Sequence, residues 1–281
     1  MNRKVKIVAD STCDLSPELL RNYQIDVIPL PVNLGDKPCL DGVDVHTSDL
    51  FSYYEETGRL PTTSAPTPAY YEELYAKWAE EGWDVVHLSI SLDLTSTHRM
   101  AKMAAEKFDC IYPVDSRNIS SGMGLLALRA AELRDEGLSA PEIAARIASL
   151  APKVRTSFVL STLLYMYKGG RCTGVQALGA NLLNLKPCIE LQNGSMGVTK
   201  KYRGNLSAVA VRLVENKLKD AKNVDCSRIL ITHCQAEDAL DKVREAIRAC
   251  QPFEEICVTD AGCSVSVHCG PGTLGIIYLE K

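Results

Sequence analysis

The sequence of 281 residues lacks a long apolar run. A helix that spans a bilayer needs about 20 consecutive apolar residues, and no stretch approaches that length. Residues 1–15 are basic, but their apolar run is too short for a secretory signal peptide. We therefore expect a cytoplasmic protein whose contact with membranes is at most transient.

Dense basic stretches are also scarce. The formal net charge is −4, with 31 Lys and Arg residues against 35 Asp and Glu residues. Proteins that bind nucleic acid usually carry a basic stripe, whereas the densest basic stretch here, residues 198–204 (VTKKYRG), is short. Nucleic acid is therefore not an expected partner.

Cysteine pairs with the CxxC spacing are absent, although the chain has 11 cysteines. The count is odd and no secretion signal precedes them, so disulfides are not expected. A zinc site needs clustered ligands, and the adjacent pairs His233-Cys234 and His268-Cys269 have the wrong spacing for two ligands on one metal. We expect free, buried thiols and no bound metal.

The familiar catalytic and cofactor motifs are missing as well. Residues 270–275 (GPGTLG) match the GxGxxG string, but dinucleotide binding needs a helix and a later acidic residue after it. Only a short, strand-like segment follows. Residues 168–174 lack the GK[ST] of a phosphate loop, and no GxSxG elbow occurs. We predict neither a catalytic residue nor a cofactor.

Strands alternate with helices over the first 150 residues. Strands are expected at residues 4–10, 25–34, 84–90 and 110–115. Helices are expected at residues 17–23, with Ser16 as the N-cap, and at residues 47–58, 69–82, 95–108, 120–137 and 139–150. Such alternation is typical of parallel strands with helices on both faces of the sheet. The predicted fold class is α/β, with a doubly wound, mainly parallel sheet.

The pattern changes after about residue 150. An Asn193-Gly194 turn predicts a hairpin over residues 186–204. Other strands are expected at residues 156–161, 228–234, 254–260 and 273–281, and helices at residues 162–171, 205–221 and 236–250. These favour a second α+β domain with a mixed sheet. Since no Gly-, Ser- or Pro-rich linker occurs, we expect closely apposed domains at residues 1–153 and 154–281.

Polar clusters follow three predicted strands, at residues 10–12, 89–97 and 115–124. In an open α/β sheet, ligands bind outside the carboxyl ends of the strands, so the clusters are candidates for a binding site. Each cluster also has a local explanation, because such side chains close turns and cap helices. Sequence reasoning leaves both explanations open.

A fourth polar cluster, PTTSAP at residues 61–66, precedes a predicted helix. Either Thr67, directly before Pro68, or Ser64 supplies the N-cap hydroxyl. Thr62 and Thr63 are then left without an obvious local role. Hydroxyls beside the open N–H groups of a helix start favour an anion site without formal charge, suited to a carboxylate or a phosphate.

Six segments, in order along the chain, resemble the DegV family, the fatty-acid-binding proteins that serve bacterial fatty-acid kinase. They are KIVADST (6–12), PTTSAP (61–66), LSISLDLTST (88–97), VDSRNISSGMG (114–124), YMYKGGR (165–171) and VHCGPGTLG (267–275). The resemblance implies the two-domain EDD fold, with one long-chain fatty acid in an apolar tunnel between the domains. It implies that the protein has no catalytic activity of its own and presents the carboxylate to an ATP-dependent kinase subunit, which makes an acyl phosphate.

The resemblance also assigns ligand-binding residues near the N-terminal hydroxyl clusters. The family's threonine pair falls on Thr62 and Thr63. Its Leu-Ser-Gly-Thr segment falls on residues 94–97, which adds Thr95, Ser96 and Thr97 to the predicted site. Thr95 keeps the hydroxyl group of the family's serine. Ser96 replaces a glycine, which permits backbone angles that serine does not.

Three further residues carry over from the C-terminal half. The histidine before the family's Gly-Pro-Gly falls on His268, and Gly270 belongs to the same segment. Arg171 matches an arginine associated with the head-group end and with kinase docking. The resemblance implies that the hydroxyl groups and the histidine hold the carboxylate. His98 stands where an aromatic residue is common in the family.

Several alternatives stay open. Residues 156–167 and 175–185 suit either tunnel walls or ordinary core. A hydrolase or transferase acting on a small carboxylated or phosphorylated molecule is the main alternative function, and a thiol-based redox or metal sensor is another. We expect a monomer or weak dimer. The preferred acyl chain depends on tunnel depth, which the sequence does not give.

Overall fold

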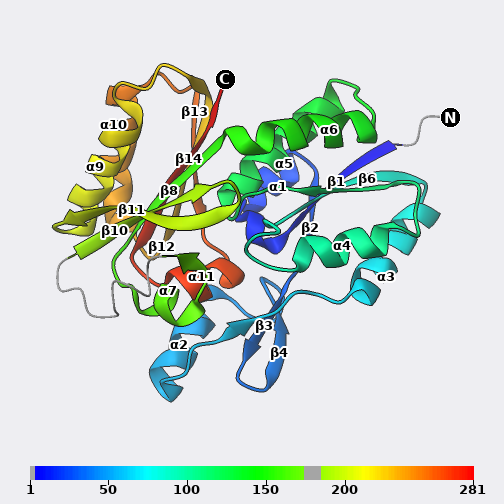
Figure 1. The fold of residues 1–281 in the computed structure, drawn as a ribbon, viewed down its shortest axis with the longest axis horizontal. Coiled ribbons are helices and arrows are strands. Elements are labelled where there is room, and N and C mark those ends of the chain that lie inside the picture. The colour runs from blue at the N-terminus through cyan, green and yellow to red at the C-terminus, as the bar shows by residue number, and fades with distance from the viewer. Residues whose placement is uncertain (1–3, 174–184) are drawn as a thin grey trace. The chain divides into compact units, whose positions relative to one another are not determined.

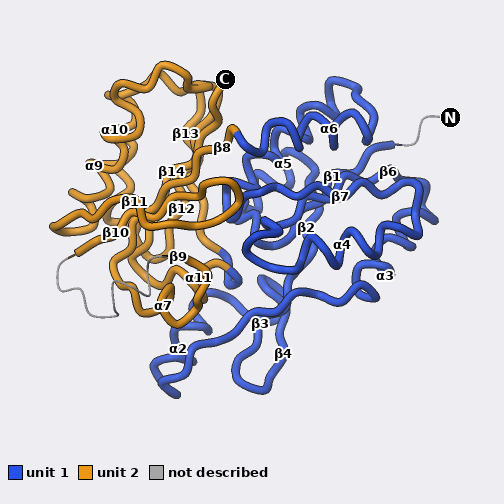
Figure 2. The backbone as a smooth tube through the Cα atoms, in the orientation of Figure 1, with its two compact units in different colours: residues 1–152, 262–264 blue, residues 153–261, 265–281 orange. Residues whose placement is uncertain are grey.

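The computed structural model describes residues 4–173 and 185–281. The chain divides into two compact units, which Figure 2 shows in different colours. Unit 1 comprises Met1–Pro152 and Gly262–Ser264, and unit 2 comprises Lys153–Ala261 and Val265–Lys281. The three late residues of unit 1 depart from the predicted division, in which each domain is one continuous segment.

A four-stranded parallel sheet forms the centre of unit 1, in the order β2-β1-β6-β7. Its strands are β1 (Lys4–Asp10), β2 (Ile25–Ile28), β6 (Trp83–Ser89) and β7 (Ile111–Asp115). Ile7, Val8, Val85 and Val86 are fully buried, as expected of parallel strands that are covered on both faces. The predicted α/β class with a parallel sheet is confirmed.

Helices lie on both faces of this sheet (Figure 1). They are α1 (Pro17–Asn22), α3 (Pro68–Glu80), α4 (Thr97–Ala105), α5 (Ser121–Asp135) and α6 (Ala140–Leu150). Helices α3 and α4 cover one face and α5 and α6 the other. On the first face, Tyr71 and Tyr75 of α3 pack with Val8, Val85 and Ala101 in one apolar core.

Unit 1 also contains a small antiparallel sheet, in the order β4-β3-β5. Its strands are β3 (Pro31–Leu34), β4 (Lys37–Leu40) and β5 (Thr62–Thr63), and helix α2 (Thr47–Thr57) lies between β4 and β5 in the chain. The extended segment predicted at residues 25–34 is thus two strands in two different sheets. Strands β4 and β5 were not among the predicted elements.

A seven-stranded mixed sheet forms unit 2, in the order β13-β12-β14-β8-β10-β11-β9. Its strands are β8 (Val154–Leu160), β9 (Cys172–Thr173), β10 (Leu185–Gln192), β11 (Ser195–Arg203), β12 (Val224–Cys234), β13 (Glu255–Asp260) and β14 (Thr273–Glu280). The β12–β13 and β11–β9 pairs are parallel, and the other pairs are antiparallel. The mixed sheet and the hairpin at Asn193-Gly194 confirm those predictions.

Helices α9 (Leu206–Leu218) and α10 (Leu240–Cys250) pack against this sheet (Figure 1). Val209, Leu213 and Ile247 from the helices form one buried core with Ile229 and Ile276 from the strands. Two shorter helices and the 3-10 turns, which come from both units, complete the described elements. They are α7 (Leu164–Gly169), α11 (Cys263–Cys269), η1 (Ser11–Cys13), η2 (Ala151–Lys153) and η3 (Glu237–Ala239).

Helix α11 and the segment before it were not predicted, because their first turn depends on distant residues. The N–H groups of Cys263 and Ser264 donate to the Asp41 carboxylate at 2.9 and 3.0 Å. The Gly262 N–H donates to Asp14 Oδ1 at 2.9 Å. These bonds explain why residues 262–264 belong to unit 1.

All 11 cysteines carry free thiols, as predicted, and most of them are buried. Burial raises the pKa of Cys13 to about 12 and that of Cys257 to about 12. In the part of the chain that the structure describes, no helix is both long and apolar enough to cross a bilayer.

Candidate functional site

Thr62 and Thr63 form strand β5 and are not part of a loop. Thr62 pairs with Asn33, and Thr63 pairs with Val32, both in β3. Because successive side chains of a strand point to opposite faces, the two hydroxyl groups cannot serve the same side of β5. Thr62 is exposed and Thr63 is half-buried. Thr63 is therefore the better placed of the two to lose water and bind a ligand group.

The N-cap of helix α3 is Thr67. Its Oγ1 accepts a hydrogen bond from the Tyr70 N–H at 3.3 Å, and Pro68 is the first helical residue. Of the two hydroxyls that the sequence offers for this cap, Thr67 is used and Ser64 is not. Thr62 and Thr63 are not needed to start the helix.

Thr95 and Thr97 form a hydroxyl pair at the start of helix α4. Their Oγ1 atoms are 3.0 Å apart, and the Thr97 N–H also donates to Thr95 Oγ1 at 3.4 Å. This turn explains why α4 begins at Thr97, whereas the predicted helix began at Thr95. Thr97 is buried, whereas Thr95 is half-buried and offers the more accessible hydroxyl.

Ser96 fits its position without backbone strain. It is the N-cap residue of α4, with φ −78° and ψ 0°, an allowed conformation with negative φ that does not require glycine. Its carbonyl oxygen accepts from the Met100 N–H at 3.0 Å. The replacement of the family's glycine by serine therefore leaves the local backbone intact.

His98 is a neutral, buried member of the unit 1 interior. Its Nδ1 lies 2.9 Å from Ser89 Oγ at the end of β6. Burial lowers the pKa of His98 below the usual histidine value. His98, directly after Thr97, therefore adds no positive charge to this part of unit 1.

Asp10, at the end of β1, does more than close a turn, which was one of the two explanations that the sequence left open. Its Oδ1 lies 3.1 Å from His87 Nε2 and accepts from the Tyr71 hydroxyl at 3.3 Å. Its Oδ2 accepts from the Ile90 N–H at 3.1 Å, where β6 ends and the loop toward Thr95 begins. Asp10 is fully buried, and its hydrogen bond with the Ile90 N–H fixes the start of this loop. The one sequence signal was a charged residue ending an apolar strand.

Arg171 and His268 meet at Gly169 in unit 2. Arg171 Nη1 donates to the Gly169 carbonyl oxygen at 2.5 Å. A Cβ atom on Gly169 would overlap Nδ1 of His268, so glycine is required for this approach. The segments KGGR and HCGPG, remote in sequence, thus lie together in unit 2.

His268 is kept neutral. Burial, and after it the positive charge of Arg171, lower its pKa to about 4. A neutral imidazole carries one N–H donor and one acceptor nitrogen. At neutral pH, His268 can therefore offer a hydrogen bond to an anion without forming an ion pair.

Gly270 supports the position of His268 from the C-terminal side. It has φ +73°, and a Cβ atom there would overlap the ring of Tyr165. Its N–H donates to the Ser266 carbonyl oxygen at 2.9 Å, which ends helix α11. Gly270 is thus a structural member of the predicted site and explains the GPG string that resembled a cofactor motif.

Of the two segments that suit either tunnel wall or core, residues 156–167 are described by the structure. In residues 156–167, Val159 and Leu160 are fully buried and Met166 is nearly so, whereas Tyr167 is 41% exposed. Val159 packs in the core of unit 2. The segment at residues 175–185 lies outside the described residues, apart from Leu185.

Comparisons with known proteins cover the full chain. The sequence profile of the DegV family, a family described as uncharacterised, matches residues 4–281. A DegV domain-containing protein from Clostridium acetobutylicum is 31% identical over 280 residues, which cover 99% of both chains.

Two further relatives are described by what they bind. A protein of Thermotoga maritima named as a fatty acid-binding protein is 29% identical over 287 residues, with 99% of each chain covered. A solved structure of a DegV family protein from Thermus thermophilus, described by its fatty acid binding, has a TM-score of 0.88 and 31% identity and covers 99% of this chain and 100% of its own. The resemblance found in the six sequence segments is confirmed: this chain belongs to the DegV family.

Proposed function

We propose that this protein binds one long-chain fatty acid and presents its carboxylate to an ATP-dependent kinase subunit for acyl-phosphate formation. Full-length similarity to relatives described as fatty-acid-binding supports the choice of ligand. The main alternative, a hydrolase or transferase, has no specific observation in its favour. The protein then acts as a lipid carrier, and the kinase performs the chemistry.

The observation that carries the proposal is the close approach of His268 to Gly169, beside Arg171, where burial keeps the imidazole neutral. A buried carboxylate is costly unless hydrogen bonds satisfy it. With its pKa lowered to about 4, His268 can donate one such bond, and the hydroxyl groups of Thr63 and Thr95 can donate others. Uncharged donors, with the positive charge of Arg171 beside His268, suit a monocarboxylate better than a dianionic phosphate, which usually recruits paired cations.

The acyl tail supplies most of the affinity in this proposal. Each methylene that leaves water contributes about 0.8 kcal/mol. A tail of about 16 carbons therefore has more apolar driving force than binding needs, even after the cost of ordering the ligand. The polar contacts then select for a carboxylate and fix its position.

Palmitate binding by a double variant tests the carboxylate contacts. We expect Thr63→Val combined with His268→Ala to weaken binding at least about 100-fold, because hydrogen bonds to a charged group contribute roughly 1.5–3 kcal/mol each. Isothermal titration calorimetry with delipidated protein gives the affinity, and circular dichroism checks the fold.

The matched control is Thr62→Val, which removes the same hydroxyl from the exposed neighbour in β5. It should leave the palmitate affinity unchanged. Unchanged affinity in the double variant would remove Thr63 and His268 from the site. An equal loss in Thr62→Val would contradict the assignment of Thr63 as the ligand-facing threonine.

Arg171 is proposed as a docking residue for the kinase, because its guanidinium is exposed beside Gly169 and His268. We expect Arg171→Ala to retain palmitate binding and to slow acyl-phosphate formation about tenfold or more with a bacterial fatty-acid kinase and ATP, since rim charges mainly govern association. Arg248→Ala, at an exposed cation of α10, is the control. An unaltered rate with Arg171→Ala would exclude this role.

A further inference from the structure

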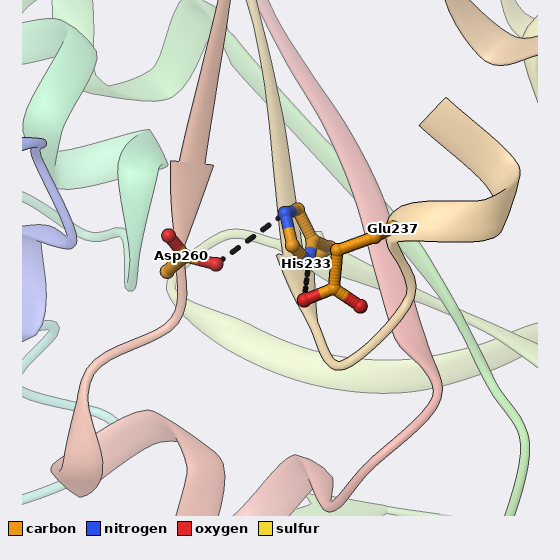
Figure 3. A group of neighbouring side chains, drawn as sticks. All are labelled: His233, Glu237 and Asp260. Atoms are coloured by element: carbon orange, nitrogen blue, oxygen red, sulfur yellow. Dashed lines mark ion pairs between the residues drawn. The ribbon is translucent and has the colours of Figure 1, made fainter. Parts of the chain in front are cut away.

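His233 lies between the carboxylates of Glu237 and Asp260, beside the carboxyl ends of the parallel strands β12 and β13 (Figure 3). It is near the end of β12, directly opposite Asp260 at the end of β13. Glu237 follows one turn later, in η3. His233 Nε2 is 3.4 Å from Asp260 Oδ1, and His233 Nδ1 is 4.0 Å from Glu237 Oε1. All three residues belong to unit 2.

The imidazole of His233 is buried, yet one of its nitrogens has no hydrogen-bond partner. The side chain is 4% exposed, and Nδ1 is among the buried polar atoms without a partner in the structure. The Glu237 oxygen in front of it, at 4.0 Å, is beyond hydrogen-bond range. Because buried polar atoms are nearly always satisfied, an unpaired nitrogen facing a carboxylate points to a missing ligand between them.

The spacing of the three side chains suits a metal ion. One nitrogen of His233 and one oxygen from each of Glu237 and Asp260 all lie within 4.8 Å of one another, the one such group of three in the part of the chain described. Two ligands on one tetrahedral zinc ion, at bond lengths of about 2.0–2.2 Å, are themselves about 3.4 Å apart. The unpaired Nδ1 of His233 lies 4.0 Å from Glu237 Oε1, somewhat more than this separation.

The carboxylates can complete the arrangement by small rotations. The side chains of Glu237 and Asp260 are 68% and 84% exposed, so neither is fixed by packing. The buried imidazole is the rigid member, held by the β12 backbone. Solvent access on the carboxylate side leaves room for water as a fourth ligand.

The ligand chemistry selects the class of metal. Imidazole nitrogen with carboxylate oxygen suits zinc and neighbouring first-row divalent ions, whereas magnesium and calcium prefer oxygen ligands alone. We propose that His233, Glu237 and Asp260 form a surface site of unit 2 for a zinc-like divalent ion, separate from the fatty-acid function. Sequence reasoning considered His233 only together with the adjacent Cys234. Asp260 comes close to His233 through the pairing of strands β12 and β13, which the sequence does not show.

Zinc titration of the full chain tests the site. With the thiols kept reduced, isothermal titration calorimetry should show that each chain binds one zinc ion at this site. The affinity for that ion should fall at least tenfold in the variant Glu237→Gln/Asp260→Asn. Both changes keep side-chain size and lie on exposed residues, so the fold is retained. The matched control Asp238→Asn alters an exposed neighbour and should leave the affinity unchanged.

A second readout separates this site from zinc held by the cysteines. Histidine-selective NMR should show the His233 ring signals shifting with one equivalent of zinc in the unmodified protein and in Asp238→Asn, but not in Glu237→Gln/Asp260→Asn. If the protein binds no zinc, or if the double variant binds it with unchanged affinity, the proposal is wrong. In the latter case the metal resides on other ligands, such as thiols.

Discussion

At the scale of single residues, the chemistry of the proposed site depends on histidines that stay uncharged. His268 and His98 are both neutral because burial disfavours their cationic forms. Asp10, a buried acid near His98 in unit 1, is satisfied by three hydrogen-bonding groups. A carboxylate ligand would then meet hydroxyl and imidazole donors without electrostatic repulsion.

Because His268 is neutral in the folded protein, we expect the free energy of unfolding to depend on pH. Its folded-state pKa is about 4, against about 6.5 in an unfolded chain. Between these values the unfolded state binds more protons, so the free energy of unfolding falls as the pH is lowered from about 6.5 to 4, by up to about 3 kcal/mol. Above pH 6.5 the contribution is complete.

Urea unfolding at pH 7.5, 6.0 and 5.0 measures this dependence. His268→Asn should flatten the fall in the free energy of unfolding, since asparagine does not titrate. His46→Asn, at an exposed histidine of the α2 N-cap, is the control for losing a histidine elsewhere. A slope that is the same in His268→Asn and the parent protein would mean that burial does not depress the pKa of His268.

Residue roles set by local backbone chemistry were predictable from the sequence. Ser16 was predicted as an N-cap and accepts from the Leu19 N–H at 3.2 Å, and Thr67 was one of two candidates for the next cap. Roles set by tertiary contacts were not predictable. The hydrogen bond from Ile90 to Asp10 and the approach of His268 to Gly169 join segments that are far apart in the chain.

At the scale of elements, the turn from α11 into β14 depends on Gly270. We expect Gly270→Ala to lower the free energy of unfolding by about 2–4 kcal/mol, because alanine adds left-handed backbone strain and overlaps the Tyr165 ring. The matched control is Gly170→Ala, where φ is +67° but the space is open. That variant should lose only about 1–2 kcal/mol.

Urea unfolding followed by circular dichroism compares the two glycine variants. The difference between them isolates the contact with Tyr165 from the cost of the backbone angle. Equal losses in Gly270→Ala and Gly170→Ala would show that the Tyr165 ring moves aside freely and that the expected overlap costs nothing.

Elements with strong periodicity and caps were predicted well, and short elements were not. Strand β5 is only two residues long and exists because β3 lies beside it. Helix α11 contains Val265 and Val267, which have low helix propensity, and its first turn bonds to Asp41. In both cases the deciding interaction comes from another part of the chain, which local sequence reasoning does not contain.

At the scale of the whole molecule, the fold class followed from the order of strand and helix signals. Alternating elements gave the parallel sheet of unit 1, and the Asn-Gly hairpin gave the antiparallel part of unit 2. The assignment of Gly262–Ser264 to unit 1 did not follow. It depends on hydrogen bonds to Asp14 and Asp41, more than 200 positions earlier.

The central claim is that one long-chain fatty acid occupies each chain, and native mass spectrometry of the freshly purified protein tests it most directly. We expect a complex heavier than the chain by the mass of one fatty acid, which organic extraction then identifies. The delipidated protein should gain melting temperature on addition of palmitate or oleate, since a ligand that binds only the folded state stabilises it. A chain without acyl ligand, and without any gain in melting temperature from either fatty acid, would contradict the account.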